Sequence, residues 1–331
     1  MYDLYLLTGA TGDLGGALIR ELLARRARVR ALVLRGDELE ADLPQAVDIC
    51  YGNVEDKASM ARFFAGDLRH ACLIHCAGLI TIATRPDPKM WRVNVEGTRN
   101  VVELCLEHGV ARAVYVSSVH AIPEQPQGHI IRETTRFYAD AVRGHYAKSK
   151  AAATALSLAA CAEGLSLSVV HPSGILSPYD RGRSHISAAI LSYCRGRLPV
   201  AVQGGYDFVD VRDVASGILA CAEQGRSGEC YILSGHYATL KDILEQVRQL
   251  VGGRPVAYLP LPLIKALAPW FEWSSLVRGR PLFLTPCSAY TLGSNAAFSY
   301  GKAQRELTYT PRSLAWTVND MIENYRRQGL I

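Results

Sequence analysis

The sequence contains no Cys-x-x-Cys pair and no apolar stretch of the roughly 18 residues that a membrane-spanning helix needs. The longest apolar candidate, residues 259–270, is broken by three prolines and a lysine. The nine cysteines lack paired spacing, which is typical of a reducing compartment where thiols serve as small apolar side chains. A strand-like segment begins at Leu4, which leaves no room for a signal peptide. We therefore expect a cytoplasmic protein without a membrane span.

The chain also lacks a large excess of charge of either sign. The chain carries 36 basic and 31 acidic side chains, a formal net charge of +5, and it has no dense basic run of the kind that nucleic-acid-binding proteins show. The arginines at 25–30 are explained by the solvated end of a helix. We expect no nucleic-acid partner and no metal site.

What the chain does contain is an alternation of strands and helices. With 331 residues, 49% of them hydrophobic, it can form one large domain, or a large domain with a smaller lobe. Strands separated by helices at this spacing predict an α/β fold with a Rossmann-type, doubly wound parallel sheet. The predicted strands are 5–7, 29–34, 48–52, 71–76, 113–117 and 167–171, and the predicted helices are 14–25, 58–64, 94–108 and 146–162.

The pattern changes after His171, where proline, glycine and arginine become frequent. Residues 1–170 are predicted to form a dinucleotide-binding domain. Residues 171–331 are predicted to form mainly a smaller, mostly helical substrate lobe, with a return to the sheet near 205–235 and a strand at 229–233.

A glycine-rich turn joins the first predicted strand to the first predicted helix, with Gly-x-x-Gly-x-x-Gly spacing. Glycine permits positive φ and lets the backbone approach a pyrophosphate, while the helix N-terminus offers N–H groups and partial positive charge. The alternative is a plain strand-to-helix turn. The expected cofactor contacts in this turn are Gly9, Thr11, Gly12, Asp13, Leu14 and Gly15.

The end of the second strand bears on the choice of cofactor. Val33 and Leu34 stand where a carboxylate would bind the ribose 2′-hydroxyl of NAD(H), and Arg35, which can pair with a 2′-phosphate, comes next. We therefore favour NADP(H). NAD(H) remains the alternative, because Arg35 can instead be solvated and Asp37 could reach back. Asn53 and Val54, after the third strand, are candidates for the adenine edge.

A Tyr-x-x-x-Lys pair, Tyr146 and Lys150, lies on one face of a predicted helix. A lysine ammonium can lower the pKa of a phenol and can hold a nicotinamide ribose, and such a phenol can exchange a proton with a carbonyl or alcohol oxygen. Ser117 and Ser118 follow the fifth strand at the edge where ligands bind, and either hydroxyl could bind the substrate oxygen. A surface tyrosine with a solvated lysine is the alternative.

Taken together, these motifs resemble the extended short-chain dehydrogenase/reductase family, of NAD-dependent epimerase/dehydratase type, over nearly the whole chain. The resemblance implies that Ser118 is the catalytic serine, Tyr146 the acid/base and Lys150 its partner. It also implies nicotinamide beside residues 172–174. The further cofactor contacts that it implies are Cys76, Ala77, Gly78, Asn94, Ser117, Tyr146, Lys150, His171, Pro172, Ser173 and Gly174.

Three branches of this family compete. Sugar-nucleotide dehydratases have Thr-Asp-Glu after the fifth strand, whereas this chain has Ser-Ser-Val-His at 117–120. Sugar epimerases usually have an acid at the second strand, which Val33 and Leu34 replace. The His-Pro-Ser-Gly segment at 171–174 and an apolar C-terminal lobe are similar to dihydroflavonol-reductase-like and 3β-hydroxysteroid-dehydrogenase-like enzymes. The apolar residues of that lobe are Leu261, Leu263, Ile264, Trp270, Phe271 and Trp273.

We therefore expect an NAD(P)(H)-dependent oxidoreductase that transfers hydride to or from a carbonyl or alcohol carbon of a fairly apolar small molecule. An NAD-dependent nucleotide-sugar epimerase is the first alternative, and a non-catalytic dinucleotide-sensing regulator is the second. Ile80, His120 and Tyr206 are candidate substrate contacts, while His145 has no assigned role. A homodimer is plausible from the resemblance alone.

Overall fold

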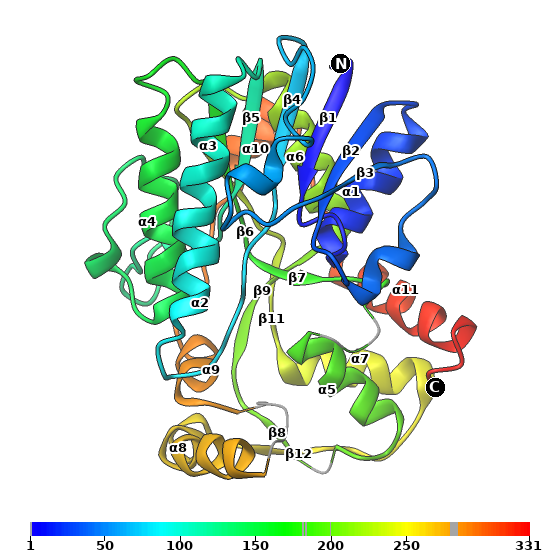
Figure 1. Cartoon of the computed structure of the whole chain (residues 1–331). Coiled ribbons are helices and arrows are strands. Elements are labelled where there is room, and N and C mark those ends of the chain that lie inside the picture. The colour runs from blue at the N-terminus through cyan, green and yellow to red at the C-terminus, as the bar shows by residue number, and fades with distance from the viewer. Residues whose placement is uncertain (1, 181, 183, 199, 279–283) are drawn as a thin grey trace.

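A seven-stranded parallel sheet forms the centre of the protein in the computed structural model, which describes residues 2–180, 182, 184–198, 200–278 and 284–331 (Figure 1). The strand order is β10-β6-β5-β4-β1-β2-β3. The strands are β1 (Leu4–Thr8), β2 (Arg28–Val33), β3 (Asp48–Tyr51), β4 (Ala71–His75), β5 (Arg112–Val116), β6 (Leu167–Pro172) and β10 (Cys230–Leu233).

Helices cover both faces of this sheet, so its central strands are apolar on both sides. On one face pack α1 (Asp13–Ala24), α6 (Val211–Gln224) and α10 (Gly301–Leu307); on the other pack α3 (Gly97–Glu107) and α4 (His145–Ala159). The strand order reverses at β1, which has β4 on one side and β2 on the other. A crevice for a ligand is expected at this reversal, beyond the carboxyl ends of the strands.

The remaining elements lie beyond that end of the sheet (Figure 1). A three-stranded sheet is formed by β7 (Gly174–Leu176), β9 (Gly205–Asp210) and β11 (His236–Thr239), and β8 (Val200–Val202) pairs with β12 (Ala257–Leu259). The helices of this part are α5 (His185–Cys194), α7 (Leu240–Val251), α8 (Leu261–Val277), α9 (Pro286–Thr291) and α11 (Leu314–Arg327).

The predicted fold class is confirmed, and the strand predicted at 229–233 is β10, which pairs with β6 at the edge of the sheet. The prediction of a helix at 58–64 is wrong. Only a 3₁₀ turn, Ala58–Met60, forms there, and irregular turns follow it. Burial of Met60, Phe63 and Phe64 in the core decides the path of this segment. Tertiary packing therefore overrides the local helical pattern.

The helix predicted from Asn94 begins differently. The chain enters through α2 (Pro88–Trp91) and a π-helical turn, Arg92–Glu96, before regular α-helix starts at Gly97. Turns of this kind occur frequently at functional sites. Here the turn contains Asn94, whose side-chain oxygen accepts from the backbone N–H of Leu79 at 2.7 Å.

Candidate active site

The glycine turn between β1 and α1 is packed so closely that side chains are excluded. Gly9 has φ +71°, and a Cβ there would lie 2.8 Å from the backbone nitrogen of Ala77. A Cβ on Gly15 would lie 2.2 Å from the carbonyl oxygen of Gly9. Gly12 is the N-cap residue of α1, and no side chain caps this helix. A bare turn leading into a helix N-terminus fits the pyrophosphate of a dinucleotide.

Buried hydroxyl and imidazole groups join the ends of β1 and β4 beside this turn. The hydroxyl of Thr8 lies 2.6 Å from Nδ1 of His75, and Nε2 of His75 lies 3.1 Å from the Thr98 hydroxyl. The backbone N–H of Ala77 donates to the Thr8 hydroxyl at 3.1 Å. These bonds fix the backbone of residues 76–78 against Gly9, which brings two predicted cofactor segments together.

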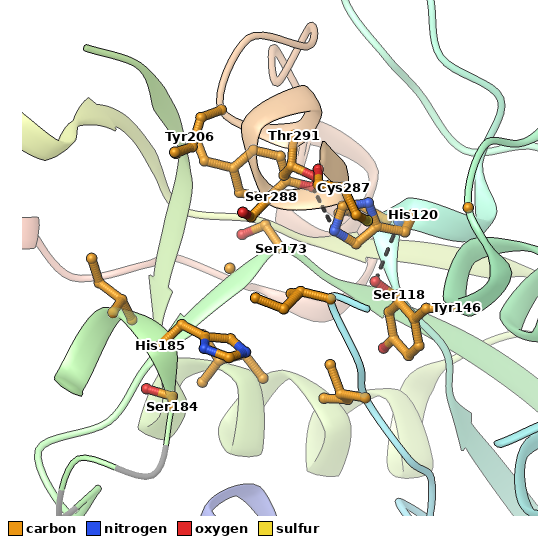
Figure 2. Close-up of a pocket in the computed structure, with 18 of the residues that line it drawn as sticks. Ser118, His120, Tyr146, Ser173, Ser184, His185, Tyr206, Cys287, Ser288 and Thr291 are labelled. Carbon is orange, nitrogen blue, oxygen red and sulfur yellow. Dashed lines mark hydrogen bonds between the residues drawn. The ribbon is translucent and has the colours of Figure 1, made fainter. Parts of the chain in front are cut away.

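Of the two candidate serines, only Ser118 is placed beside Tyr146. The Ser117 hydroxyl lies 2.7 Å from that of Thr154 in α4, whereas Ser118 and Tyr146 lie side by side in the pocket (Figure 2). Removal of the Tyr146 phenol from water raises its pKa to about 12, and a hydrogen bond with the Ser118 hydroxyl acts in the opposite direction. The phenol therefore carries its proton at neutral pH.

Lys150 lies one helical turn after Tyr146 and points into the same pocket from α4. Its ammonium donates to the carbonyl oxygen of Val116 at 2.9 Å. Burial lowers the pKa of Lys150 to about 8, and Cys76 acts in the opposite direction. A Cβ on Gly78 would lie 3.4 Å from Nζ of Lys150 and 3.2 Å from Oδ1 of Asn94. Lys150, Gly78 and Asn94 thus form one cluster.

His120 and Tyr206, two of the predicted substrate contacts, stack on each other in the pocket (Figure 2). Their ring centroids are 5.6 Å apart, and the Tyr206 hydroxyl lies 3.3 Å from Nε2 of His120. The His120 ring also meets the Tyr146 ring edge-on at 6.0 Å. Desolvation lowers the pKa of His120 to about 4, so its imidazole is neutral at pH 7. The third contact, Ile80, lines the same pocket and is 75% exposed.

The pocket is a single cavity of about 1650 Å³ that runs from the glycine turn to α9. It contains most of the predicted site: Gly9, Gly12, Asp13, Leu14, Gly15, Cys76, Gly78, Ile80, Ser117, Ser118, His120, Tyr146, Lys150, Pro172, Ser173, Gly174 and Tyr206 line it. Beyond Ser118 and Tyr146 its wall is mostly apolar, from Ile264, Phe271, Leu284 and Phe298 among others. The cavity can hold a dinucleotide end and an apolar ligand together.

Other predicted residues lie outside this cavity wall. His171 is buried, its Nδ1 lies 2.9 Å from the carbonyl oxygen of Ser118, and its ring stacks on Phe137. It therefore supports the loop that carries Ser118. Arg35 is exposed over the ring of Tyr51, and Val54 packs against Gly97.

Three further predicted residues are held by local hydrogen bonds. Asn53 accepts from the backbone N–H of Glu55 at 3.0 Å. The hydroxyl of Thr11 donates to the carboxylate of Asp37 at 2.7 Å. Asp37 thus reaches back to the glycine turn.

The part of the wall that comes from α5 and α9 is not predicted by any motif in the sequence. Ser184 and His185 approach from α5, and Cys287, Ser288 and Thr291 approach from α9 (Figure 2). They lie more than 30 residues from Tyr146 in the chain, so no spacing rule connects them to it. A signal did exist for α9 itself, because Thr285-Pro286-Cys287-Ser288 matches a capping box with proline at the first helical position.

The two fully buried histidines give the folded protein a dependence on pH. Burial lowers the pKa of His75 to about 3 and that of His171 to about 4. An unfolded histidine binds a proton below about pH 6.5, so each one costs up to about 1.4 kcal/mol of stability per pH unit as acid is added. Asp207 offsets the effect of one of these histidines on stability. Burial raises the pKa of the Asp207 carboxyl to about 6, so the folded state binds this proton at a higher pH than the unfolded state does. We expect the free energy of unfolding in urea to fall between about pH 6.5 and pH 4.

The exposed His70 provides the control for this prediction. His75→Asn should flatten the pH dependence, because one buried site no longer excludes a proton, and His70→Asn should leave it unchanged. A free energy of unfolding that is constant across this range, or equal slopes for the wild type and His75→Asn, would contradict the expectation.

A doubly wound sheet, a bare glycine turn at its point of reversal and a Ser-Tyr-Lys set beside it define a class of nicotinamide-dependent oxidoreductases. The model of the NAD dependent epimerase/dehydratase family matches residues 5–234, more than half of the chain. The chain belongs to this family, and it is an NAD(P)-dependent oxidoreductase of the extended short-chain dehydrogenase/reductase type.

Two curated relatives and one solved structure illustrate the similarity. The chain is 31% identical to "Sterol demethylase protein B" of Methylococcus capsulatus, over 98% of this chain and 99% of that protein. It is 31% identical to "3 beta-hydroxysteroid dehydrogenase type 7" of Mus musculus, over 93% and 91% of the two chains. The crystal structure of gox2253 superposes with a TM-score of 0.85 at 32% identity, over 99% of both chains. The predicted family is thereby confirmed.

Proposed function

We propose that the protein interconverts a carbonyl and an alcohol on an apolar, ring-containing substrate, with NADP(H) preferred over NAD(H). The observation that carries this proposal is the Ser118–Tyr146 pair in a cavity that is lined both by the glycine turn and by a mostly apolar wall. A substrate oxygen held by both hydroxyls would place the rest of the molecule against apolar wall.

The residues around the crevice fit a dinucleotide. The backbone of residues 9–15 would receive the pyrophosphate, because no Cβ fits at Gly9 or Gly15. Lys150 and the backbone at Gly78 would hold the ribose next to the nicotinamide, which residues 172–174 would flank. The bound cofactor supplies or accepts the hydride; the protein supplies position and protons.

The proton comes from this chain. Tyr146 is protonated at neutral pH, and it would give its proton to the carbonyl oxygen during reduction and recover one during oxidation. The Ser118 hydroxyl would donate a hydrogen bond to the same oxygen and hold it in place. Lys150, with a pKa lowered to about 8, would hold its charge close to the developing phenolate.

An apolar substrate is supported by the wall beyond this pair and by the family members. Two relatives similar over nearly their full length carry names that refer to sterols or steroids. Glu124, a carboxylate of the cavity wall, accepts hydrogen bonds from the Tyr290 hydroxyl and from the backbone N–H of Asn295. It is thus engaged in structure, which argues against the extra acid/base pair that a dehydratase needs.

The preference for NADP(H) rests on Arg35. It is the exposed cation that follows β2, and its guanidinium lies 5.1 Å from the centroid of the Tyr51 ring. A guanidinium in this place can pair with a 2′-phosphate, while Asp37 is already bonded to Thr11.

The test is reduction of a panel of steroid ketones, aliphatic ketones and aldehydes, followed by the loss of NADPH or NADH absorbance. We expect turnover with cyclic apolar ketones and a higher kcat/KM with NADPH. Arg35→Ser should raise the KM for NADPH about ten- to a hundredfold and leave that for NADH unchanged, since one charge-assisted bond is lost. Arg26→Ser, also on the surface, is the matched control.

Conversion of UDP-glucose to an epimer with NAD retained through purification, and no ketone turnover, would replace this proposal with the epimerase alternative. Equal kcat/KM for the two reduced nucleotides would remove only the preference for NADP(H).

A further inference from the structure

The outward face of α8 is apolar along its whole length. Leu263, Leu267, Trp270, Trp273 and Val277 recur every three or four residues, and all are exposed, Trp270 by 56% and Trp273 by 59%. A surface helix of a globular protein normally presents polar side chains to water on this face. Five large apolar side chains in one stripe therefore mark a surface that contacts something other than water.

The inward face of α8 carries the carboxylate instead. Glu272 is buried, and its oxygens accept from the backbone N–H of Thr84 at 2.7 Å and from the Thr84 hydroxyl at 2.8 Å. Ile264 and Ala268 pack on the same side against Ala289 of α9. The helix is thus held in this orientation, because turning the tryptophans inward would break the bonds of a buried carboxylate.

The exposed charges of α8 itself are positive. They are Lys265 and, at its C-cap, Arg278, while the loop that bonds to Glu272 carries the exposed Arg85 and Asp87. Glu272, whose carboxylate points inward, is the only acidic residue of α8. Tryptophan is enriched at the interface between membrane and water, and lysine and arginine are attracted to anionic lipid headgroups.

We propose that α8 docks the protein onto the surface of a membrane that contains anionic lipid. The helix would lie in the plane of the headgroups with Trp270 and Trp273 inserted. It does not span the bilayer: no helix within the described residues is long and apolar enough to do so. In Figure 1 α8 lies at the lower edge of the molecule, far from the central sheet, where a flat surface can reach it.

The cavity supports this assignment independently of the reaction. Ile264 and Phe271 of α8 line the cavity, and Phe271 is also 38% exposed. The apolar wall of the cavity therefore continues to the helix that would rest on the lipid. An apolar ligand dissolved in the bilayer could pass from the lipid into the cavity without crossing water. Exposure of apolar surface to water costs about 25 cal/mol per Å².

The experiment is flotation of the full-length protein with vesicles of phosphatidylcholine, with and without phosphatidylglycerol. We expect the wild type to float with the vesicles that contain phosphatidylglycerol. The double variant Trp270→Ser/Trp273→Ser should bind them at least about tenfold more weakly, since two inserted side chains are lost. Quenching of tryptophan fluorescence by brominated lipid should disappear in the same variant.

The other two tryptophans of the chain provide the matched control. Trp91 and Trp316 are exposed on α2 and α11 and are not part of α8, so Trp91→Ser/Trp316→Ser should float like the wild type. Far-ultraviolet circular dichroism establishes that both variants are folded. The proposal is overturned if the wild type does not float, or if the control variant loses binding equally. It is also overturned if the α8 variant only dissociates a dimer without lipid, which would identify the occupant as a second copy. None of these outcomes depends on ketone turnover.

Discussion

Replacing Tyr146 with phenylalanine should lower kcat by about a hundredfold to ten-thousandfold, the contribution of a positioned proton donor. The variant removes one oxygen atom and keeps the ring that meets His120 edge-on. Cofactor affinity measured by calorimetry should stay unchanged, because the turn at Gly9–Gly15 and Lys150 are intact. The loss should therefore appear in kcat and kcat/KM and not in the dissociation constant for NADPH.

Tyr138→Phe is the control for this substitution. Tyr138 is 65% exposed and lies outside the cavity wall, so the loss of its hydroxyl should leave turnover unchanged. Near-normal turnover of Tyr146→Phe would show that another group protonates the substrate oxygen. His120 would then be the first residue to test, because its ring lies beside that of Tyr146.

Replacing Gly15 with alanine should abolish tight binding of the cofactor. The new Cβ would lie 2.2 Å from the carbonyl oxygen of Gly9 and 2.7 Å from Cα of Ala10, so the turn must open. Overpacking of this kind costs about 1–3 kcal/mol or more. We expect the affinity for NADPH to fall by at least about a hundredfold, because the backbone N–H groups of the turn no longer converge on the pyrophosphate. The thermal midpoint should also fall.

Gly16→Ala, one residue further along α1, should have the opposite effect on stability. The nearest atom to its new Cβ is 3.6 Å away, on the flexible side chain of Arg20. Alanine inside a helix is favoured over glycine by about 0.5–1 kcal/mol, so this variant should be as stable as the wild type or more stable. A Gly15→Ala protein that binds NADPH like the wild type would show that the turn does not hold the pyrophosphate.

The sequence by itself determined the features that depend on near neighbours. Short apolar segments that alternate with helical patterns along the chain indicated the strands of the parallel sheet, because a strand buried on both faces must be apolar. Glycine spacing indicated the turn at 9–15, and Tyr146 with Lys150 follows from the repeat of an α-helix. The resemblance of the combined motifs then gave the family, which the match over residues 5–234 confirmed.

Local patterns were insufficient where a distant segment decides the outcome. The helix predicted at 58–64 does not form, because Met60, Phe63 and Phe64 are drawn into the core. The position after the fifth strand does not by itself separate Ser117 from Ser118, although the family resemblance favours Ser118. Thr154 of α4, 37 residues away, engages the hydroxyl of Ser117 and leaves Ser118 beside Tyr146.

Only the tertiary structure placed His120 against Tyr206 and brought α5 and α9 into the cavity wall. The same holds for α8, whose sequence is rich in apolar side chains. A bond between Glu272 and Thr84, 188 residues apart, decides that its carboxylate faces inward and its tryptophans face outward. Such choices are made by contacts between segments that are remote in the chain, and the free energy of those contacts is not contained in any local pattern.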